Sequence, residues 1–147
     1  MIVRPLARQD LAALEPLVAE SEADGFHFLR RFHGDWLAGR ARADAVDEWF
    51  LGVFDGGALV AVGGVTPDPY AADARVGRVR HLYVARAHRR RGLGRRLLAE
   101  LEARARGVYD LLRLRTDTPE ASRFYESLGF APVESGSATH LRRLRDS

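Results

Sequence analysis

Residues 89–94, with the sequence Arg-Arg-Arg-Gly-Leu-Gly, constrain the fold of this chain more than any other segment. They lie between a predicted strand, residues 76–84, and a predicted helix from about 93 to 106 with apolar side chains at helical spacing. The first N–H groups of a helix lack partners within it, and the helix dipole adds about half a positive charge there. Glycines also allow a close backbone approach. The segment therefore predicts an anion-binding turn, with a solvated basic turn as the alternative.

The composition is that of an ordinary globular protein. The chain has 147 residues, of which 46% are hydrophobic and 29% charged, so we expect a single domain spanning residues 1–147. The absence of cysteine excludes disulfides, thiolate metal sites and a cysteine nucleophile. No apolar run approaches the ~20 residues of a membrane span, and no signal peptide is recognisable. We expect a cytoplasmic protein without a metal and without a membrane partner.

Positive charge is concentrated in one stretch of the chain. The net charge is +3, all 23 basic residues are arginine, and residues 75–96 hold nine arginines and no acidic residue. Such a stretch favours an anionic ligand. Nucleic-acid binding is one alternative, but the stretch lacks interleaved aromatic residues and any recognised nucleic-acid motif. We therefore expect no nucleic-acid partner.

The hydrophobic pattern predicts an α/β (α+β) chain built on a mostly antiparallel sheet. Residues 55–57, Asp-Gly-Gly, are typical of a hairpin turn. Thr118 and Pro119 are typical of a helix start, as N-cap and first helical residue. The predicted strands are residues 2–5, 49–54, 58–66, 76–84, 111–116, 130–134 and 138–144. The predicted helices are residues 10–20, 26–37, 93–106 and 119–128.

A dinucleotide-binding fold is one framework for the glycine turn, and Asp117 matches the acidic residue that such a fold places after the next strand. However, Leu97 occupies the position of the third glycine, and the basic segment 85–91 separates the strand from Gly92 where that fold turns tightly. The preceding strands also form hairpins rather than crossovers. These three features disfavour a dinucleotide fold.

Residues 78–130 resemble the GNAT-type N-acetyltransferases. The acyl-CoA loop of that family is Arg/Gln-x-x-Gly-x-Gly/Ala after a strand ending in Leu-Tyr-Val, and this chain has Leu-Tyr-Val at 82–84 and Arg-x-x-Gly-x-Gly at 89–94. The second family motif is Asn-x-x-Ala-x-x-x-Tyr-x-x-x-Gly-Phe, which residues 118–130 match except for Thr118 in place of asparagine. The resemblance implies a GNAT-like fold, with a mixed sheet of six to seven strands and about four helices.

The resemblance also implies a site for acetyl-CoA. The turn amides would bind the pyrophosphate, the end of the preceding strand would bond the pantetheine arm through its main chain, and the two strands beside it would splay apart. Tyr125 would be the general acid that protonates the CoA thiolate, the alternative being a helix core residue. The implied cofactor-binding residues are Leu82, Tyr83, Val84, Arg89, Arg90, Arg91, Gly92, Leu93, Gly94, Arg95, Thr118 and Tyr125.

One position departs from the family pattern. Many members have a glutamate, the general base, six residues before the valine of Leu-Tyr-Val, and that position is Arg78 here. Arginine stays charged and cannot act as a base. If Arg78 and Arg80 face the cleft, strict alternation turns His81 away from it. The alternatives for the base are His81, Asp117, His140, an acid near Asp47 and Glu48, or water.

Arg78 and Arg80 lie two residues apart on a strand and would share a face. If that face lines the acceptor cleft, both are candidate substrate-binding residues that attract a carboxylate or phosphate on the acceptor. Ion pairing within the protein, or plain solvation, is the alternative.

The expected activity is transfer of the acetyl group of acetyl-CoA to a primary amine, by direct attack in a ternary complex. The partner would be a small-molecule or peptide amine, and the protein a monomer or homodimer. A non-catalytic acyl-CoA-binding module and an arginine-rich nucleic-acid-binding domain are the alternatives. The sequence leaves the identity of the acceptor and the use of other acyl-CoAs open.

Overall fold

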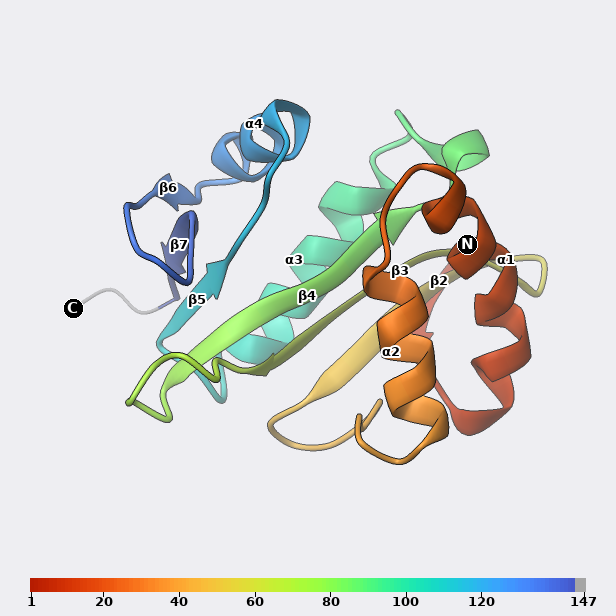
Figure 1. Ribbon diagram of the computed structural model, residues 1–147, viewed down its shortest axis with the longest axis horizontal. Coiled ribbons are helices and arrows are strands. Elements are labelled where there is room, and N and C mark those ends of the chain that lie inside the picture. The colour runs from red at the N-terminus through yellow and green to blue at the C-terminus, as the bar shows by residue number, and fades with distance from the viewer. Residues whose placement is uncertain (145–147) are drawn as a thin grey trace.

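A seven-stranded sheet organises the chain in the computed structural model, which describes residues 1–144 (Figure 1). Its order is β1-β2-β3-β4-β5-β7-β6; β4 and β5 run parallel, and the other neighbouring pairs are antiparallel. The strands are β1 (Ile2–Pro5), β2 (Trp49–Asp55), β3 (Ala58–Pro67), β4 (Val76–Val84), β5 (Leu111–Leu114), β6 (Ala131–Pro132) and β7 (His140–Arg143). The helices are α1 (Leu11–Ala23), α2 (Phe28–Leu37), α3 (Leu93–Ala105) and α4 (Pro119–Ser127), with short 3-10 turns at Arg8–Asp10 and Arg86–His88.

This architecture confirms the expected α+β fold class. The main differences from the predicted elements are that the first helix continues to Ala23 and that the closing strand pair is shorter. Pairing between β6 and β7 is confined to residues 131–132 against 140–141. The closing strands were predicted from hydrophobic alternation, which does not specify how far two strands remain paired.

Helices cover both faces of the sheet and enclose two separate cores (Figure 1). On one face, α3 buries Leu97 and Leu101 completely against the middle strands. On the other face, Leu14 of α1 and Phe32 of α2 pack over the same strands. Burial of one such large apolar side chain contributes about 1.5–3 kcal/mol to the stability of the fold. Both helix layers are therefore fixed to the sheet.

The strands β4 and β5 are paired over only part of their length. Residues 76–78 of β4 lie opposite residues 111–113 of β5, and β4 then continues to Val84 without this neighbour. The two strands therefore separate, as the family resemblance implied, and one edge of β4 is left for other partners.

A β-bulge in β4 changes which face its side chains occupy. The register with β3 shifts between the Val62–Tyr83 and Gly64–Arg80 pairs, and His81 adopts a φ of 58°. Val79 belongs to the core under α3, so alternation places Arg80 on the α2 face. His81 stacks on Phe28, Phe32 and Phe50, which belong to that same face. The extra residue of the bulge thus puts Arg80 and His81 on one face, and strict alternation was the wrong expectation here.

The aromatic packing beneath the bulge depends on Gly64. A Cβ at this position would lie 2.2 Å from the Phe50 ring and 2.7 Å from the Trp49 carbonyl oxygen. We expect Gly64→Ala to lower the free energy of unfolding by about 1–3 kcal/mol, the usual cost of overpacking a core.

Gly34→Ala provides the matched control. This glycine lies within α2, and its Cβ would meet no atom within 4 Å. Alanine there should raise the unfolding free energy by about 0.5–1 kcal/mol. Chemical denaturation of the three proteins measures both changes, and an unaltered midpoint for Gly64→Ala would contradict the packing described.

Candidate active site

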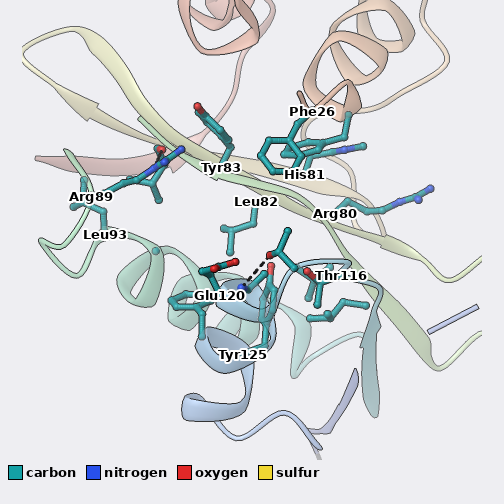
Figure 2. Close-up of a pocket in the computed structure, with 18 of the residues that line it drawn as sticks. Phe26, Arg80, His81, Leu82, Tyr83, Arg89, Leu93, Thr116, Glu120 and Tyr125 are labelled. Atoms are coloured by element: carbon teal, nitrogen blue, oxygen red, sulfur yellow. Dashed lines mark hydrogen bonds between the residues drawn. The ribbon is translucent and has the colours of Figure 1, made fainter. Parts of the chain in front are cut away.

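A cavity of about 800 Å³ opens where β4 and β5 separate. Its walls are the second half of β4, the turn at residues 88–95, the residues after β5 and the first turns of α4 (Figure 2). The residues of both sequence motifs meet here, because the sheet places the glycine turn and α4 on opposite sides of the separated strands. Phe26 and Phe28, which precede and begin α2, line it from a third side.

The backbone N–H groups of residues 90–95 are free to bind an anion. Within the described part of the chain, none of them donates a hydrogen bond to a backbone or side-chain acceptor. The first hydrogen bond of the helical pattern is that of the Arg96 N–H, which donates to the Gly92 carbonyl at 3.0 Å. The N-terminus of α3 adds its dipole to these donors. The turn therefore presents a positively charged nest of N–H groups toward the cavity.

The two glycines of the turn have different structural roles. Gly92 has a φ of 75°, in the left-handed region, and a Cβ there would meet no protein atom within 4 Å. Gly94 has no such conformation, but its Cβ would lie 3.2 Å from the Phe124 ring of α4. Gly92 thus shapes the turn, whereas Gly94 allows α3 to pack closely on Phe124.

Carboxylates at the end of α1 hold the segment that precedes the turn. Glu20 accepts hydrogen bonds from the Tyr83 hydroxyl at 2.7 Å and from the backbone N–H of Arg86 at 3.0 Å. Asp24 pairs with the guanidinium of Arg86 and, at 3.5 Å, with that of Arg89. The sequence prediction missed this network. The one local sequence signal for the network is the four-residue spacing of Glu20 and Asp24, which puts both acids on the same side of a helix.

The free edge of β4 carries main-chain groups toward the cavity. The N–H of Ala85 bonds the Val60 carbonyl of β3 at 2.8 Å. Because backbone groups alternate between the two edges of a strand, those of Val84 are directed to the opposite edge. There the Val84 carbonyl accepts a hydrogen bond from Arg89 Nε at 3.0 Å. Its N–H and the backbone of Leu82 remain as candidate ligand donors and acceptors.

Tyr125 projects from α4 into the cavity (Figure 2). Its ring is 9% exposed and packs edge-on against Phe124 and Phe130, with centroids 5.2 and 5.5 Å away. Its hydroxyl has no hydrogen-bond partner among residues 1–144, and burial raises the pKa of this phenol above its usual value. A protonated donor with no internal partner therefore faces the gap between the strands.

Thr118 occupies the N-cap position of α4, as predicted. Its Oγ1 accepts a hydrogen bond from the Ala121 N–H at 3.2 Å, the dashed line in Figure 2. The hydroxyl proton of Thr118 remains available to a ligand, and its side chain lines the cavity.

The candidate bases differ in where they lie. His81 lines the cavity, but burial lowers the pKa of its imidazole to about 3, with Arg80 adding to the effect. Asp117 also lines it, with an 82% exposed side chain that is 3.7 Å from Arg115. His140 is held between Glu126 and Thr139, each at 2.9 Å, away from the cavity lining.

Neither acid near the start of β2 reaches the cavity. Asp47 pairs with Arg42 at 3.1 Å, and Glu48 accepts a hydrogen bond from the Arg42 N–H at 2.7 Å. Both carboxylates fix the loop before β2, and neither belongs to the cavity lining.

The two candidate substrate-binding arginines have different surroundings. Arg78 is buried, pairs with Asp68 at 3.3 Å and donates to the Ser137 carbonyl at 2.7 Å. Ion pairing, the alternative considered for both residues, thus describes Arg78. Arg80 lines the cavity, and its Nε is buried without a hydrogen-bond partner among the described residues.

Several solved structures share this fold. A candidate acetyltransferase from Exiguobacterium sp. 255-15 has a TM-score of 0.84 and 27% identity, over 97% of this chain and 92% of that one. The PaiA N-acetyltransferase of Thermoplasma acidophilum, solved in complex with coenzyme A, has a TM-score of 0.77 and 21% identity, over 97% and 98% of the two chains.

No helix within residues 1–144 has the length and apolar character needed to span a membrane.

Sequence comparison identifies the family. This chain is 38% identical over 91 residues to the N-alpha-acetyltransferase RimI of Mycobacterium tuberculosis, a match that covers 57% of this chain and only 52% of that protein. The family model described as the acetyltransferase (GNAT) domain matches residues 47–132, which include the cavity's β4, turn and α4. The chain therefore belongs to the GNAT acetyltransferases, the acetyl-CoA-dependent family that its two sequence motifs indicated.

Proposed function

We propose that residues 1–147 form one N-acetyltransferase domain that moves the acetyl group of acetyl-CoA directly to a primary amine. The observation that carries the proposal is the set of unpaired N–H groups at residues 90–95, placed beside the free edge of β4. An anion-binding nest next to an open strand edge fits a ligand that has a diphosphate at one end and amide groups along its arm. The match to an N-alpha-acetyltransferase supports an amine as the acceptor.

The residues of the cavity fit acetyl-CoA along its length. We assign the diphosphate to the N–H groups of residues 90–95, with Arg90, Arg91 and Arg95 adding positive charge. The pantetheine amides would bond the main chain of Leu82 and Val84 in the manner of an added strand. When bound, acetyl-CoA supplies an activated thioester.

Tyr125 is the proposed general acid. The acceptor nitrogen forms a bond to the acetyl carbon, the C–S bond breaks, and Tyr125 protonates the departing sulfur before regaining a proton from solvent. Its raised pKa keeps the phenol protonated at neutral pH, so that the hydroxyl proton is present when the sulfur departs. Burial against Phe124 and Phe130 fixes the ring, and the absence of an internal partner leaves the hydroxyl free for the sulfur.

We assign the proton of the attacking amine to water rather than to a side chain. Two imidazoles line the cavity: His81, whose pKa of about 3 makes it a poor base at neutral pH, and His88, which lies 3.3 Å from Asp55. Arg78, at the position of the family's glutamate, cannot accept a proton. The reactive species is then the fraction of acceptor that is already deprotonated in solution.

The turn can be tested by adding negative charge where phosphate would lie. We expect the double variant Gly92→Glu, Gly94→Glu to weaken coenzyme A binding at least 100-fold in calorimetry, because two carboxylates would face the diphosphate and Gly92 would lose its left-handed conformation. Gly107→Glu is the matched control, at the opposite end of α3 with no atom within 4 Å of its Cβ. Unchanged affinity in the double variant would contradict the proposed function.

Tyr125→Phe removes the proposed proton donor and keeps the ring. We expect kcat to fall at least tenfold, because general acid–base groups usually contribute about 10²–10⁴-fold to the rate. The Kd for acetyl-CoA should change less than threefold. Release of free CoA thiol with an accepted amine gives kcat, and calorimetry gives Kd. A variant with the turnover of the unmodified protein would refute the assignment.

The pH profile distinguishes water from histidine as proton acceptor. The pKa of Tyr125 is raised, so its proton is lost only above its usual value near 10, and His81 stays neutral from pH 6 to 9.5. We therefore expect kcat/KM to rise with pH along the ionisation of the amine, in both the unmodified protein and His81→Asn. Asparagine tolerates the positive φ of this position. An additional limb near pH 6.5 that disappears in His81→Asn would identify the histidine as base instead.

A further inference from the structure

The cavity has two ends, and the proposed function assigns only one of them. Figure 2 shows Arg89 and Leu93 at one end and Arg80 at the other, with Leu82 and Tyr125 between them. If the diphosphate binds at the turn and the thioester lies beside Tyr125, the acceptor has to approach from the end marked by Arg80. The inference below rests on that proposed function and concerns what this second end recognises.

Arg80 has no partner for its charge. Its guanidinium makes no hydrogen bond and no ion pair with any residue from 1 to 144, and its Nε is buried. A buried, unsatisfied N–H of a charged group is costly, because that N–H has given up water without gaining another acceptor. The cavity beside it is the place from which an acceptor group can reach this atom.

The carboxylates near Arg80 are already engaged. Asp68 lies between Arg78 at 3.3 Å and Arg113 at 3.6 Å, so that one acid serves two arginines. Glu48 accepts from the N–H of Arg42 and lies 3.8 Å from its guanidinium. Both acids act on Arg80 electrostatically, but neither makes a hydrogen bond or ion pair with it, so its guanidinium has no paired carboxylate among residues 1–144.

A second cation faces the same end. Arg31 of α2 lines the cavity, and its side chain has no hydrogen bond or ion pair within the described part of the chain. Both arginines act electrostatically on His81, whose ring stacks on Phe28 to form an apolar wall. The acceptor end thus combines an apolar wall with two unpaired guanidinium groups, which bind carboxylate and phosphate oxygens through forked hydrogen bonds.

We propose that the acceptor of this enzyme is a small amine that carries a carboxylate or phosphate, and that Arg80 binds this anionic group, with Arg31 adding to the attraction. Arg80 is a specificity-determining residue in this scheme. The bulge in β4 contributes to this arrangement. Its extra residue places His81 on the same face as Arg80, whereas regular alternation would place His81 on the opposite face.

Matched amine pairs test the proposal by release of free CoA thiol. The pairs are L-alanine with L-alaninamide and O-phosphoethanolamine with ethanolamine, and spermidine represents polycationic amines. We expect kcat/KM, calculated on the concentration of deprotonated amine, to be at least tenfold higher for the anionic member of at least one pair, and the pair that responds tells carboxylate from phosphate. A neutral member or spermidine as the preferred acceptor would overturn the proposal.

Substitution of Arg80 links the preference to this side chain. In Arg80→Gln we expect KM for the anionic amine to rise at least tenfold and the preference to fall to about one, while kcat and the Kd for acetyl-CoA stay within threefold. Arg80→Lys should keep part of the preference. Arg143 is an exposed arginine on β7 outside the cavity, so Arg143→Gln is the control and should change neither the KM for the anionic amine nor the preference. A preference that survives in Arg80→Gln would overturn the role of Arg80.

A binding measurement does not depend on the choice of amine. In protein saturated with coenzyme A, the Nε–Hε resonance of ¹⁵N-labelled Arg80 should shift saturably on addition of succinate or inorganic phosphate. The signal is assigned by its loss in Arg80→Gln. A resonance that moves with neither anion would overturn this inference even where coenzyme A binds normally. Loss of coenzyme A binding itself would instead contradict the proposed function.

Discussion

The separation of β4 from β5 after a short parallel pairing is the constraint on which the rest of the site depends. The pairing stops at Arg78 opposite Arg113, and both arginines share Asp68, whose side chain is fully buried. Removing one partner of a buried ion pair lowers stability by about 3–5 kcal/mol. This cluster therefore fixes the position at which the strands part. Beyond it, β4 alone continues under α2 and supplies a free edge to the cavity.

Irregular backbone in two segments then places the chemical groups along that edge. The left-handed conformations of Arg90 and Gly92 turn the chain so that consecutive N–H groups precede α3. The left-handed conformation of His81 shifts the alternation of β4 by one residue. One irregularity shapes the end of the cavity that we propose for the acetyl donor and the other shapes the end that we propose for the acceptor, while the regular strand between them carries Leu82 toward Tyr125 (Figure 2).

Features encoded by neighbouring residues were predictable from the sequence. The glycine turn, the Thr118 N-cap and the position of Tyr125 on a helix all follow from local spacing, and their convergence followed from the family resemblance. The partner of Arg78 could not be found in this way, because Asp68 lies ten positions earlier, across a loop, and the same sequence is compatible with either solvation or ion pairing. The bulge at His81 was equally hidden, because hydrophobic alternation specifies a face only while the register with the neighbouring strand is unbroken.

The contacts of α1 with the segment before the turn have a mechanical consequence. Glu20 and Asp24 join the end of this helix to Tyr83, Arg86 and Arg89, and α1 packs with α2 over the acceptor side of the sheet. The helical layer beside the proposed acceptor end is thereby fastened to the segment that precedes the proposed diphosphate-binding turn. A displacement of that segment would therefore pull on Glu20 and Asp24, and so on the helix that packs beside the opposite mouth of the cavity.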